Sequence, residues 1–336
     1  MTTVTTPRRR LSIRGAAREL SVVGALVVIV VVTTLITPSF LNAQGVVNLL
    51  ANCTLYIVLA LGQSLVVLTR NIDLSVGSIV GLTAYGTGVT FAALPGIPIV
   101  LVFVIGAVFG AVLGAVNGLI VAIAKVPSLV VTLGTLYIYR GLANLWAGSN
   151  QYFAGSRPDA FGELSTSTFF GLPYITLGAI VLVIIVGVYT LRVRSGRDLY
   201  AIGSDPDAAV LFGIPVAKRI VWAFAWCGAL TGLAGVIYAS SFNSVGATTG
   251  TGYELQVVAA VVVGGVAIFG GSGTAVGASL GAILLITING ALPAVGISKF
   301  WQQAIVGVLI VAAIMTDRIL TVVRARRLRT TEAEHD

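Results

Sequence analysis

The sequence predicts an all-α polytopic membrane protein with about ten transmembrane helices, arranged as two inverted five-helix repeats, and with both termini in the cytoplasm. The first observation is composition: 57% of the 336 residues are hydrophobic and 10% are charged, whereas a soluble domain carries about 25% charged residues. The second is the length of the apolar runs, about twenty residues without alternation, which favours helices over a β-barrel in a bilayer. The third is the distribution of basic residues, which sets the orientation.

Ten apolar segments are candidates for membrane spans. We expect a cytoplasmic tail at 1–19, a transmembrane domain at 20–318 and a second cytoplasmic tail at 319–336. Repeat one covers about 20–147 and repeat two about 173–318. Arginines precede the first apolar run, but no small-residue cleavage pattern follows it, so we expect this span to be retained. The expected spans are 20–37, 46–69, 74–94, 97–123, 128–147, 173–191, 220–240, 255–270, 275–293 and 300–316.

The basic residues favour one orientation. With the N-terminus in the cytoplasm, all but three of the 20 lysines and arginines fall on the cytoplasmic side of the spans. The exceptions are Arg140, Arg157 and Lys299. Basic residues concentrate in cytoplasmic loops, so the loop 192–219 is expected inside and the loop 148–172 outside.

Short internal matches indicate the repeat. The sequence GAVLGA at 110–115 in the fourth span matches GASLGA at 277–282 in the ninth, and an Asn-Gly pair follows each. Acidic residues, Asp73 and Glu254, open the third and eighth spans. Each correspondence is five spans apart, and an odd shift inverts the second half relative to the first. Inverted repeats of this kind recur in transporters that rock around a central site.

Glycines recur at every fourth position in several spans. Small residues at this spacing make a smooth strip on which another helix packs closely. Such strips serve any helical membrane protein, so they predict tight packing and not a particular function. They are Gly106, Gly110, Gly114 and Gly118 in the fourth span, Gly228 and Gly232 in the seventh, and Gly273, Gly277 and Gly281 around the start of the ninth.

The loop 192–219 is the most charged polar interruption, and it contains a short helix with both ends specified. Asp205 can cap the first free N–H groups, and Pro206 suits the first helical position. Gly213 supplies a left-handed stop. A helix of about two turns cannot bury its apolar face alone, so we interpret it as a plug offered to another protein. The alternative is a surface turn lying on the membrane.

Two span openings are candidates for a translocation path. Asp73 opens the third span, flanked by Asn71 and Ser75; it is either a helix cap near the cytoplasmic face or part of a gate. The eighth span is short and interrupted by glycines, and such segments at corresponding positions of two halves point to a translocation site. The candidates at its outer end are Asn243, Gly252, Tyr253 and Glu254.

The fifth span carries an unusual cation. Arg140 lies in its outer half with Tyr137 and Asn144 close by. Arg140 either extends to the membrane interface or lines a wet cavity, and we include all three residues in the candidate path.

Several classes of chemistry are excluded. The single histidine, His335, is next to the C-terminal residue, and the two cysteines, Cys53 and Cys227, lie in apolar runs, so we expect no metal and no histidine-based catalysis. The segment 271–277, GSGTAVG, resembles a dinucleotide fingerprint, but no acidic residue follows about twenty positions on. No phosphate-binding P-loop occurs. We therefore expect no cofactor and no enzyme activity, and the net charge of +8 gives no reason to expect nucleic acid.

Together the motifs resemble the membrane permease subunit of ribose-type ABC importers, the binding-protein-dependent transport inner membrane component family. The segments LTRNIDLSVGS (68–78) and TLGTLYIYRG (132–141) are especially similar to autoinducer-2 and rhamnose-type permeases. Gln256 departs from ribose permeases, which usually have an acid there. The matching segments are LTRNIDLSVGS (68–78), NGLIVA (117–122), TLGTLYIYRG (132–141), SGRDLYAIGSDPDAAVLFGI (195–214), TGTGYELQVVAAVVVGG (249–265) and FGGSGTAVGASLGA (269–282).

The resemblance implies an assembly in the bacterial inner membrane. It implies a second permease chain, as a homodimer or heterodimer, two cytoplasmic ATP-binding subunits, and an extracytoplasmic sugar-binding protein. The permease would translocate a sugar-like solute by alternating access and hydrolyse nothing. The alternative from the residues is an ion-coupled secondary transporter that uses Asp73 or Glu254. The segment 195–214 resembles the ATPase-coupling region, with candidates Arg197, Tyr200, Gly203, Asp205, Ala208, Leu211, Phe212 and Gly213.

Overall fold

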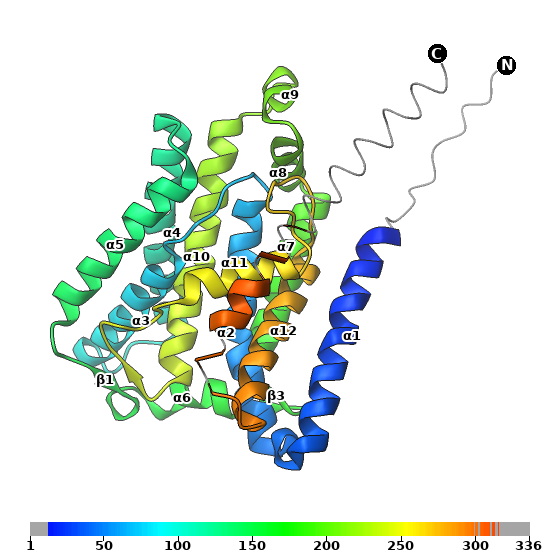
Figure 1. The fold of residues 1–336 in the computed structure, drawn as a ribbon. Coiled ribbons are helices and arrows are strands. Elements are labelled where there is room, and N and C mark those ends of the chain that lie inside the picture. The colour runs from blue at the N-terminus through cyan, green and yellow to red at the C-terminus, as the bar shows by residue number, and fades with distance from the viewer. Residues whose placement is uncertain (1–12, 299, 302, 310, 313–314, 316–336) are drawn as a thin grey trace.

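The computed structural model describes residues 13–298, 300–301, 303–309, 311–312 and 315, and the side chains from residue 19 onward. It is a bundle of long helices that run roughly along one direction (Figure 1). The helix α1 (Ile13–Ile36) starts at the end of the bundle where α8 (Arg194–Ser204) and α9 (Pro206–Leu211) project, and it finishes at the opposite end.

Helices lie at nine of the ten expected spans in the described part of the chain. The tenth, 300–316, falls partly outside it, and so do most of the tail at 1–19 and all of the tail at 319–336. Besides α1, these helices are α2 (Ala43–Val67), α3 (Val76–Ala93), α4 (Ile99–Ala124), α5 (Ser128–Ala147), α7 (Tyr174–Arg192), α10 (Val216–Ser241), α11 (Tyr253–Val263) and α12 (Ala275–Ala294).

Seven of the described helices are long and apolar enough to cross a membrane: α1, α2, α3, α4, α7, α10 and α12. The expected span at 255–270 is too long, because α11 ends at Val263 after 11 residues. Glycines with positive φ, including Gly265 at 102° and Gly270 at 79°, then carry the chain through an irregular segment at 264–274. The prediction that this span is short and interrupted by glycine is confirmed.

Small elements occupy the end of the bundle opposite α9. They pair as two antiparallel two-stranded ribbons, with Tyr152 opposite Val245 in one and Phe169 opposite Leu172 in the other. The loop 148–172 therefore contains helices and strands that the sequence did not indicate. The elements are η1 (Pro38–Leu41), β1 (Tyr152–Phe153), η2 (Ala154–Ser156), α6 (Asp159–Thr166), β2 (Thr168–Phe169), β3 (Leu172–Pro173) and β4 (Ser244–Val245).

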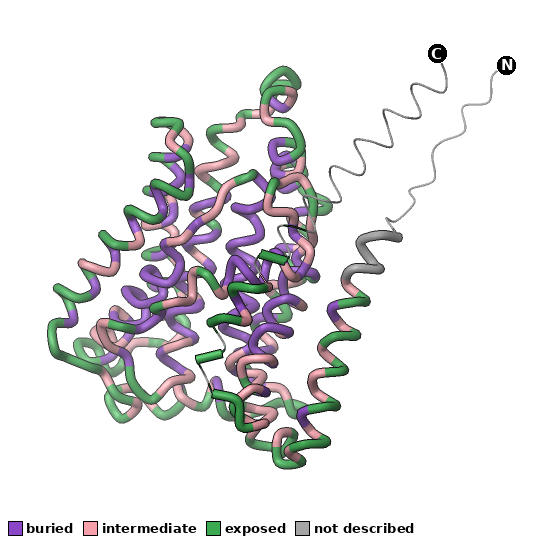
Figure 2. Tube along the Cα trace, viewed as in Figure 1, coloured by how far each residue is buried: buried purple, intermediate pink, exposed green. Residues whose placement is uncertain are grey.

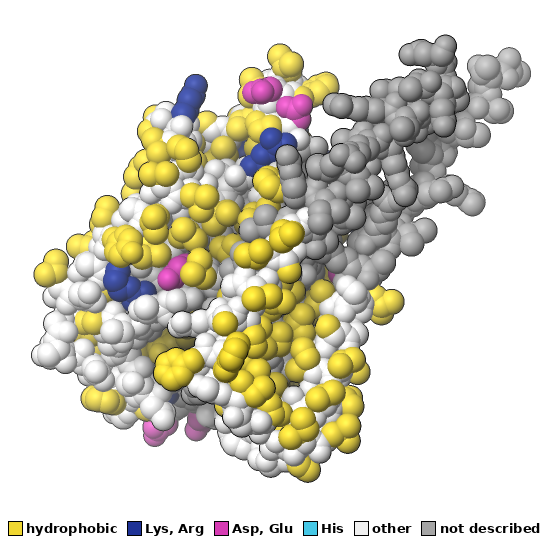
Figure 3. Space-filling model, viewed as in Figure 1, with side chains coloured by type: hydrophobic (Ala, Val, Ile, Leu, Met, Phe, Trp, Pro, Cys, Tyr) yellow, Lys and Arg dark blue, Asp and Glu magenta, His cyan; other side chains and the backbone are white. Residues whose placement is uncertain are grey.

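The helix α2 forms the centre of the bundle. Its residues from Thr54 to Val67 are all buried, and it packs against α10, α12, α7 and α11. Buried residues accordingly concentrate in the middle of the trace (Figure 2). The visible outer surface is largely covered by apolar side chains (Figure 3), as expected for a surface in contact with lipid.

The predicted glycine strips pack backbone against backbone. At Gly110 of α4 an added methyl group would meet the Gly228 carbonyl oxygen and the backbone of Gly232 on α10. At Gly281 of α12 it would meet the Ala260 carbonyl oxygen of α11. The spacing of these glycines is therefore explained by close helix contact.

Candidate functional site

The irregular segment 68–75 between α2 and α3 holds Asp73 in a fully buried position. The Asp73 Oδ1 atom accepts hydrogen bonds from the Ser75 N–H at 2.8 Å and the Ser75 hydroxyl at 2.7 Å. The Asn117 amide donates to the Ser75 hydroxyl oxygen at 2.8 Å, and the Tyr139 hydroxyl donates to the Asn117 Oδ1 at 3.3 Å. Asp73 thus turns the chain into α3 and ties that turn to α4 and α5.

The second carboxylate oxygen of Asp73 is buried without a hydrogen-bond partner among the described residues. Removal from water raises the pKa of the Asp73 carboxyl above its ordinary value, and the bonds from Ser75 and Asn117 oppose that rise. The Gln63 amide, oriented to satisfy both groups, donates to the Asp73 carbonyl and accepts from its N–H, each at 3.1 Å. The side-chain amide of the neighbouring Asn71 donates to the carbonyl and the hydroxyl of Thr69, each at 3.0 Å.

The opposite end of the bundle carries the loop 242–252, which leads into α11. Arg140 reaches from α5 to this loop and donates to the carbonyl oxygens of Thr249 at 2.6 Å and Ala247 at 3.3 Å. Arg140 is half-buried, and its guanidinium is engaged by backbone carbonyls of this loop.

Glu254 lies in the first turn of α11, close to α3. A methyl group at Gly77 would meet the Glu254 carboxylate and the Gly250 carbonyl oxygen, so glycine at this position allows the loop to approach. The Glu254 Oε2 atom is buried without a hydrogen-bond partner in the described residues. Each of the two candidate acids, Asp73 and Glu254, thus retains one unsatisfied oxygen.

A polar cavity of about 260 Å³ lies beside this loop. Every residue in its lining is neutral, and hydroxyl and amide groups dominate. Tyr253 is the only member of the expected path in that lining; the ring of Tyr56 lies 5.0 Å and that of Tyr238 6.3 Å from it. The lining residues are Gln151, Tyr238, Ser244, Gly246, Thr248, Thr249, Gly250, Thr251 and Tyr253.

The other expected path residues lie outside this cavity. Tyr137 is 69% exposed, and Asn144 is also exposed, because the buried face of α5 is formed by Thr132, Thr135, Tyr139 and Ala143. Asn243 is exposed and accepts a backbone hydrogen bond from Ala154. Gly252 has a φ of 86° and precedes α11. The structure therefore does not bring Tyr137 and Asn144 to the cavity.

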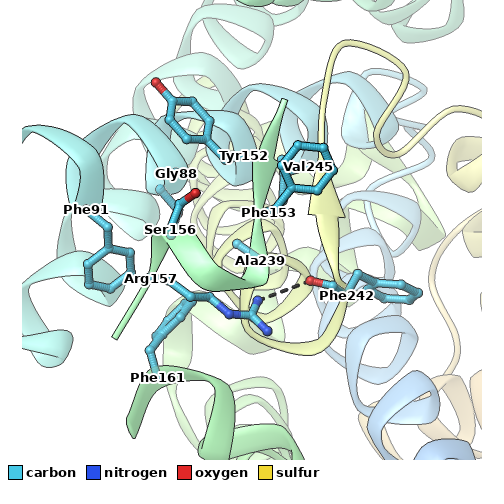
Figure 4. A pocket seen from close by; sticks show the side chains of 11 residues that line it. Gly88, Phe91, Tyr152, Phe153, Ser156, Arg157, Phe161, Ala239, Phe242 and Val245 are labelled. Atoms are coloured by element: carbon cyan, nitrogen blue, oxygen red, sulfur yellow. Dashed lines mark hydrogen bonds between the residues drawn. The ribbon is translucent and has the colours of Figure 1, made fainter. Parts of the chain in front are cut away.

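A second cavity, of about 20 Å³, lies between the loop 148–172, which we call the outer loop, α3 and the end of α10 (Figure 4). Arg157 donates to the Phe242 carbonyl at 3.1 Å, and its guanidinium carbon lies 5.8 Å from the centre of the Phe161 ring. Space of this size holds about one water molecule. We interpret it as a packing joint that holds the outer loop on the bundle.

The charged loop 192–219 forms α8 and α9. The Asp205 carboxylate accepts from the N–H groups of Asp207 and Ala208 at 3.1 and 3.0 Å, which confirms the predicted cap. Gly213 has a φ of 74° and ends the helix. Beside it, Leu211 is 88% and Phe212 84% exposed.

The remaining coupling candidates divide between surface and interior. Arg197 is exposed and Ala208 is half-buried. The Tyr200 hydroxyl donates to the Gly273 carbonyl at 3.0 Å. Gly203 is buried against Leu68 and Gly271. The sequence reasoning missed α8 as a helix and its ion pair, Asp198–Arg219 at 2.8 Å.

A multi-pass helical bundle with an apolar exterior and a neutral polar cavity has the architecture expected of a membrane permease. The chain belongs to the family described as the branched-chain amino acid transport system / permease component, whose model matches residues 45–314. It is therefore a transport-system permease component of the plasma membrane and not an enzyme. The predicted resemblance to permease subunits is confirmed.

The chain also aligns with individual relatives over most of their length. The chain is 36% identical over 301 residues to the autoinducer 2 import system permease protein LsrC of Enterobacter sp., covering 89% of this chain and 86% of the relative. It is 33% identical over 313 residues to the ribose import permease protein RbsC of Bacillus subtilis, covering 93% and 97%. A further LsrC, from Klebsiella pneumoniae, is 36% identical over 316 residues, covering 93% and 90%. No solved structure matches the chain.

Proposed function

We propose that the chain is the membrane-spanning subunit of an ATP-binding-cassette importer and translocates a neutral, hydroxyl-rich solute such as a sugar. A separate ATP-binding subunit supplies the energy. The observation that carries this proposal is the surface of α9, where Leu211 and Phe212 are 88% and 84% exposed at the tip of a charged loop. Exposed large apolar side chains on a capped helix are typical of a surface on which another protein docks.

The cavity supports the solute class. Its lining consists of neutral hydroxyl, amide and backbone groups with two tyrosines, which can exchange hydrogen bonds with a sugar without attracting an ion. Its volume of about 260 Å³ is large enough for several water molecules, each about 30 Å³ in liquid water. The relatives named for ribose and autoinducer 2 agree with a small polar solute, and rhamnose belongs to the same class.

Helix packing supports the ten-span inverted repeat. The repeat pairs α4 with α12 and α2 with α10, and the structure packs α4 against α10 and α12 against α2. It also pairs α3 with α11, and each follows an irregular segment, with an acid close to the start of the helix: Asp73 three residues before α3 and Glu254 in the first turn of α11. The irregular segments that precede α3 and α11, 68–75 and 242–252, lie at opposite ends of the bundle, as inversion requires. The concentration of lysines and arginines on one side of the spans supports the further proposal that both termini and α9 face the cytoplasm.

The path in this proposal runs past both interrupted segments. Asp73 and Ser75 lie at its inner end, and Glu254, Tyr253 and the cavity at its outer end. Closure of the ATP-binding subunits moves α9, the two repeats rock, and the cavity changes the side to which it opens. The partners in the full assembly are two ATP-binding subunits, an extracytoplasmic sugar-binding protein and a second permease chain.

The test is uptake by the complete assembly in vesicles, with radiolabelled ribose as the probe. Phe212→Asp places a charge on the docking surface and is expected to abolish uptake and ATP-coupled transport while the protein still inserts. The matched control, Ala217→Asp, adds the same charge at another exposed position of the loop. Wild-type uptake in Phe212→Asp would refute the docking assignment. Ribose movement by the permease alone under an ion gradient, without ATP-binding subunits, would establish the ion-coupled alternative.

A further inference from the structure

Three segments meet directly beneath the cytoplasmic helices. They are the irregular segment 68–75 that follows α2, the last turn of α8, and the irregular segment 264–274 that follows α11. We call their meeting point the junction. The Gly271 N–H donates to the Leu68 carbonyl at 3.1 Å, and this bond joins the irregular segment that follows α2 to the irregular segment that follows α11.

Arg70 attaches α8 to the junction. Its Nε donates to the Gly203 carbonyl at 2.6 Å and its Nη2 to the Ser204 carbonyl at 2.5 Å. These carbonyls are at the C-terminus of α8, where the helix dipole favours a cation and where carbonyl groups lack partners within the helix. Arg70 itself has a φ of 64°, a conformation that non-glycine residues adopt only when the surroundings hold them there.

The glycines of the junction leave no room for a larger residue at their positions. A methyl group at Gly203 would meet the Leu68 carbonyl oxygen and the Gly271 nitrogen, and one at Gly270 would meet Arg70. A methyl group at Gly271 would meet the backbone of Gly203 and Ser204. Backbone packed this closely moves as a unit, because interiors at this density are not continuously deformable.

The same segment reaches the path three residues after Arg70. The Ser128 hydroxyl accepts from the Ile72 N–H at 3.1 Å, and Thr132 of α5 donates to the Ile72 carbonyl at 3.2 Å. Asp73 then makes its bonds to Ser75. The segment 68–75 is thus held by α8 at one end and by α3, α4 and α5 at the other.

We propose that Arg70 is the link that transmits movement of α8 and α9 to both irregular segments of the junction, 68–75 and 264–274, and so to the translocation path. Arg70 is a positioning residue, since its guanidinium bonds the last carbonyls of α8. This role rests on the proposed function, in which α9 receives the movement of the ATP-binding subunits. Loss of the link separates ATP hydrolysis from transport, whereas loss of a simple helix cap leaves the two coupled.

The first experiment compares wild type, Arg70→Ala, Arg70→Lys and the control Lys218→Ala, which removes an exposed cation of the loop 192–219. Each is assembled with its ATP-binding subunits and binding protein in vesicles, with radiolabelled ribose as the probe. Arg70→Ala is expected to keep its subunits and its ATP hydrolysis but to lose uptake about tenfold, within the roughly 5–150-fold range typical of coupling between sites. Arg70→Lys is expected to fall between, because lysine keeps the charge without the planar fork. Lys218→Ala is expected to behave as wild type.

The second experiment reads the junction without transport. Hydrogen exchange on the purified assembly is expected to accelerate at 68–75 and 264–274 in Arg70→Ala, including the Gly271 amide, while 206–211 stays as in wild type. Unchanged exchange at Gly271, or wild-type uptake by Arg70→Ala, would overturn the link. Loss of the ATP-binding subunits from Arg70→Ala would also overturn it, since Arg70 would then serve docking. Wild type that shows no ATP-driven uptake would instead refute the proposed function, and the link would fall with it.

Discussion

Replacing Gly110 by alanine tests the packing that holds the two halves together. The added methyl group would lie 2.8 Å from both the Cα and the nitrogen of Gly232, and would overlap the Gly228 carbonyl oxygen. Carbon atoms pack at about 3.5–4.0 Å, so α4 and α10 must separate by about 1 Å, and a gap of that size forfeits up to about half of each contact's dispersion energy. Overpacking of this kind costs about 1–3 kcal/mol.

A matched control makes the same glycine-to-alanine substitution at a position where it is expected to stabilise the protein. Gly134 lies on α5 with nothing within 4 Å of an added methyl group, so Gly134→Ala gains helix propensity worth about 0.5–1 kcal/mol. Both free cysteines, Cys53 and Cys227, are buried. A thiol-reactive dye therefore reports unfolding on heating without further labelling.

Gly110→Ala is expected to unfold several degrees below wild type, and Gly134→Ala at or slightly above it, since about 1 kcal/mol moves the midpoint by about 2–4 °C in a chain of 150–250 residues and less in a longer one. Equal midpoints for the two variants would refute the reasoning. They would mean that α4 and α10 are not in backbone contact along this strip.

Three further changes probe the path and the coupling helix. Burial raises the pKa of the Asp73 carboxyl, so the folded state binds that proton more tightly than the unfolded chain and loses stability as the pH rises through the raised pKa. Asp73→Asn removes this titration and is expected to flatten that part of the plot of unfolding midpoint against pH, measured with the same dye. A plot identical to that of wild type would contradict the expectation. Arg140→Gln removes the bonds to the Thr249 and Ala247 carbonyls and is expected to speed hydrogen exchange in 246–252; protection equal to wild type would argue against this clamp. Asp205→Ala removes the cap of α9, a loss of about 0.5–2 kcal/mol to that helix, and is expected to lower ribose uptake several-fold without changing the unfolding midpoint; undiminished uptake would show that the cap has no part in coupling.

The features that local chemistry specifies could be predicted from the sequence. The cap and stop of α9 follow from Asp205, Pro206 and Gly213, and the helix lies where they place it. The close contact of α4 follows from the four-residue spacing of Gly110 and its neighbours, and the interruption after α11 follows from its glycines.

Contacts between distant segments could not be predicted. Arg140 is 109 residues from Thr249 along the chain, and no local pattern names that carbonyl as its partner. Gln63 and Asn117 lie inside apolar runs, where an amide gives no sign that it holds Asp73. The short strands of the loop 148–172 could not be predicted, because each has two residues and β1 depends on pairing with β4. Tyr137 was included only because it lies close to Arg140 in sequence.

Labelling at position 211 tests the central claim most directly, namely that α9 is the cytoplasmic surface on which the ATP-binding subunit docks. Leu211→Cys introduces an exposed thiol into a chain whose two native cysteines are buried. A membrane-impermeant maleimide is predicted to label it from the cytoplasmic side in the permease alone and to be blocked once the ATP-binding subunits are bound. Labelling from the external side, or equal labelling with and without those subunits, would contradict the account.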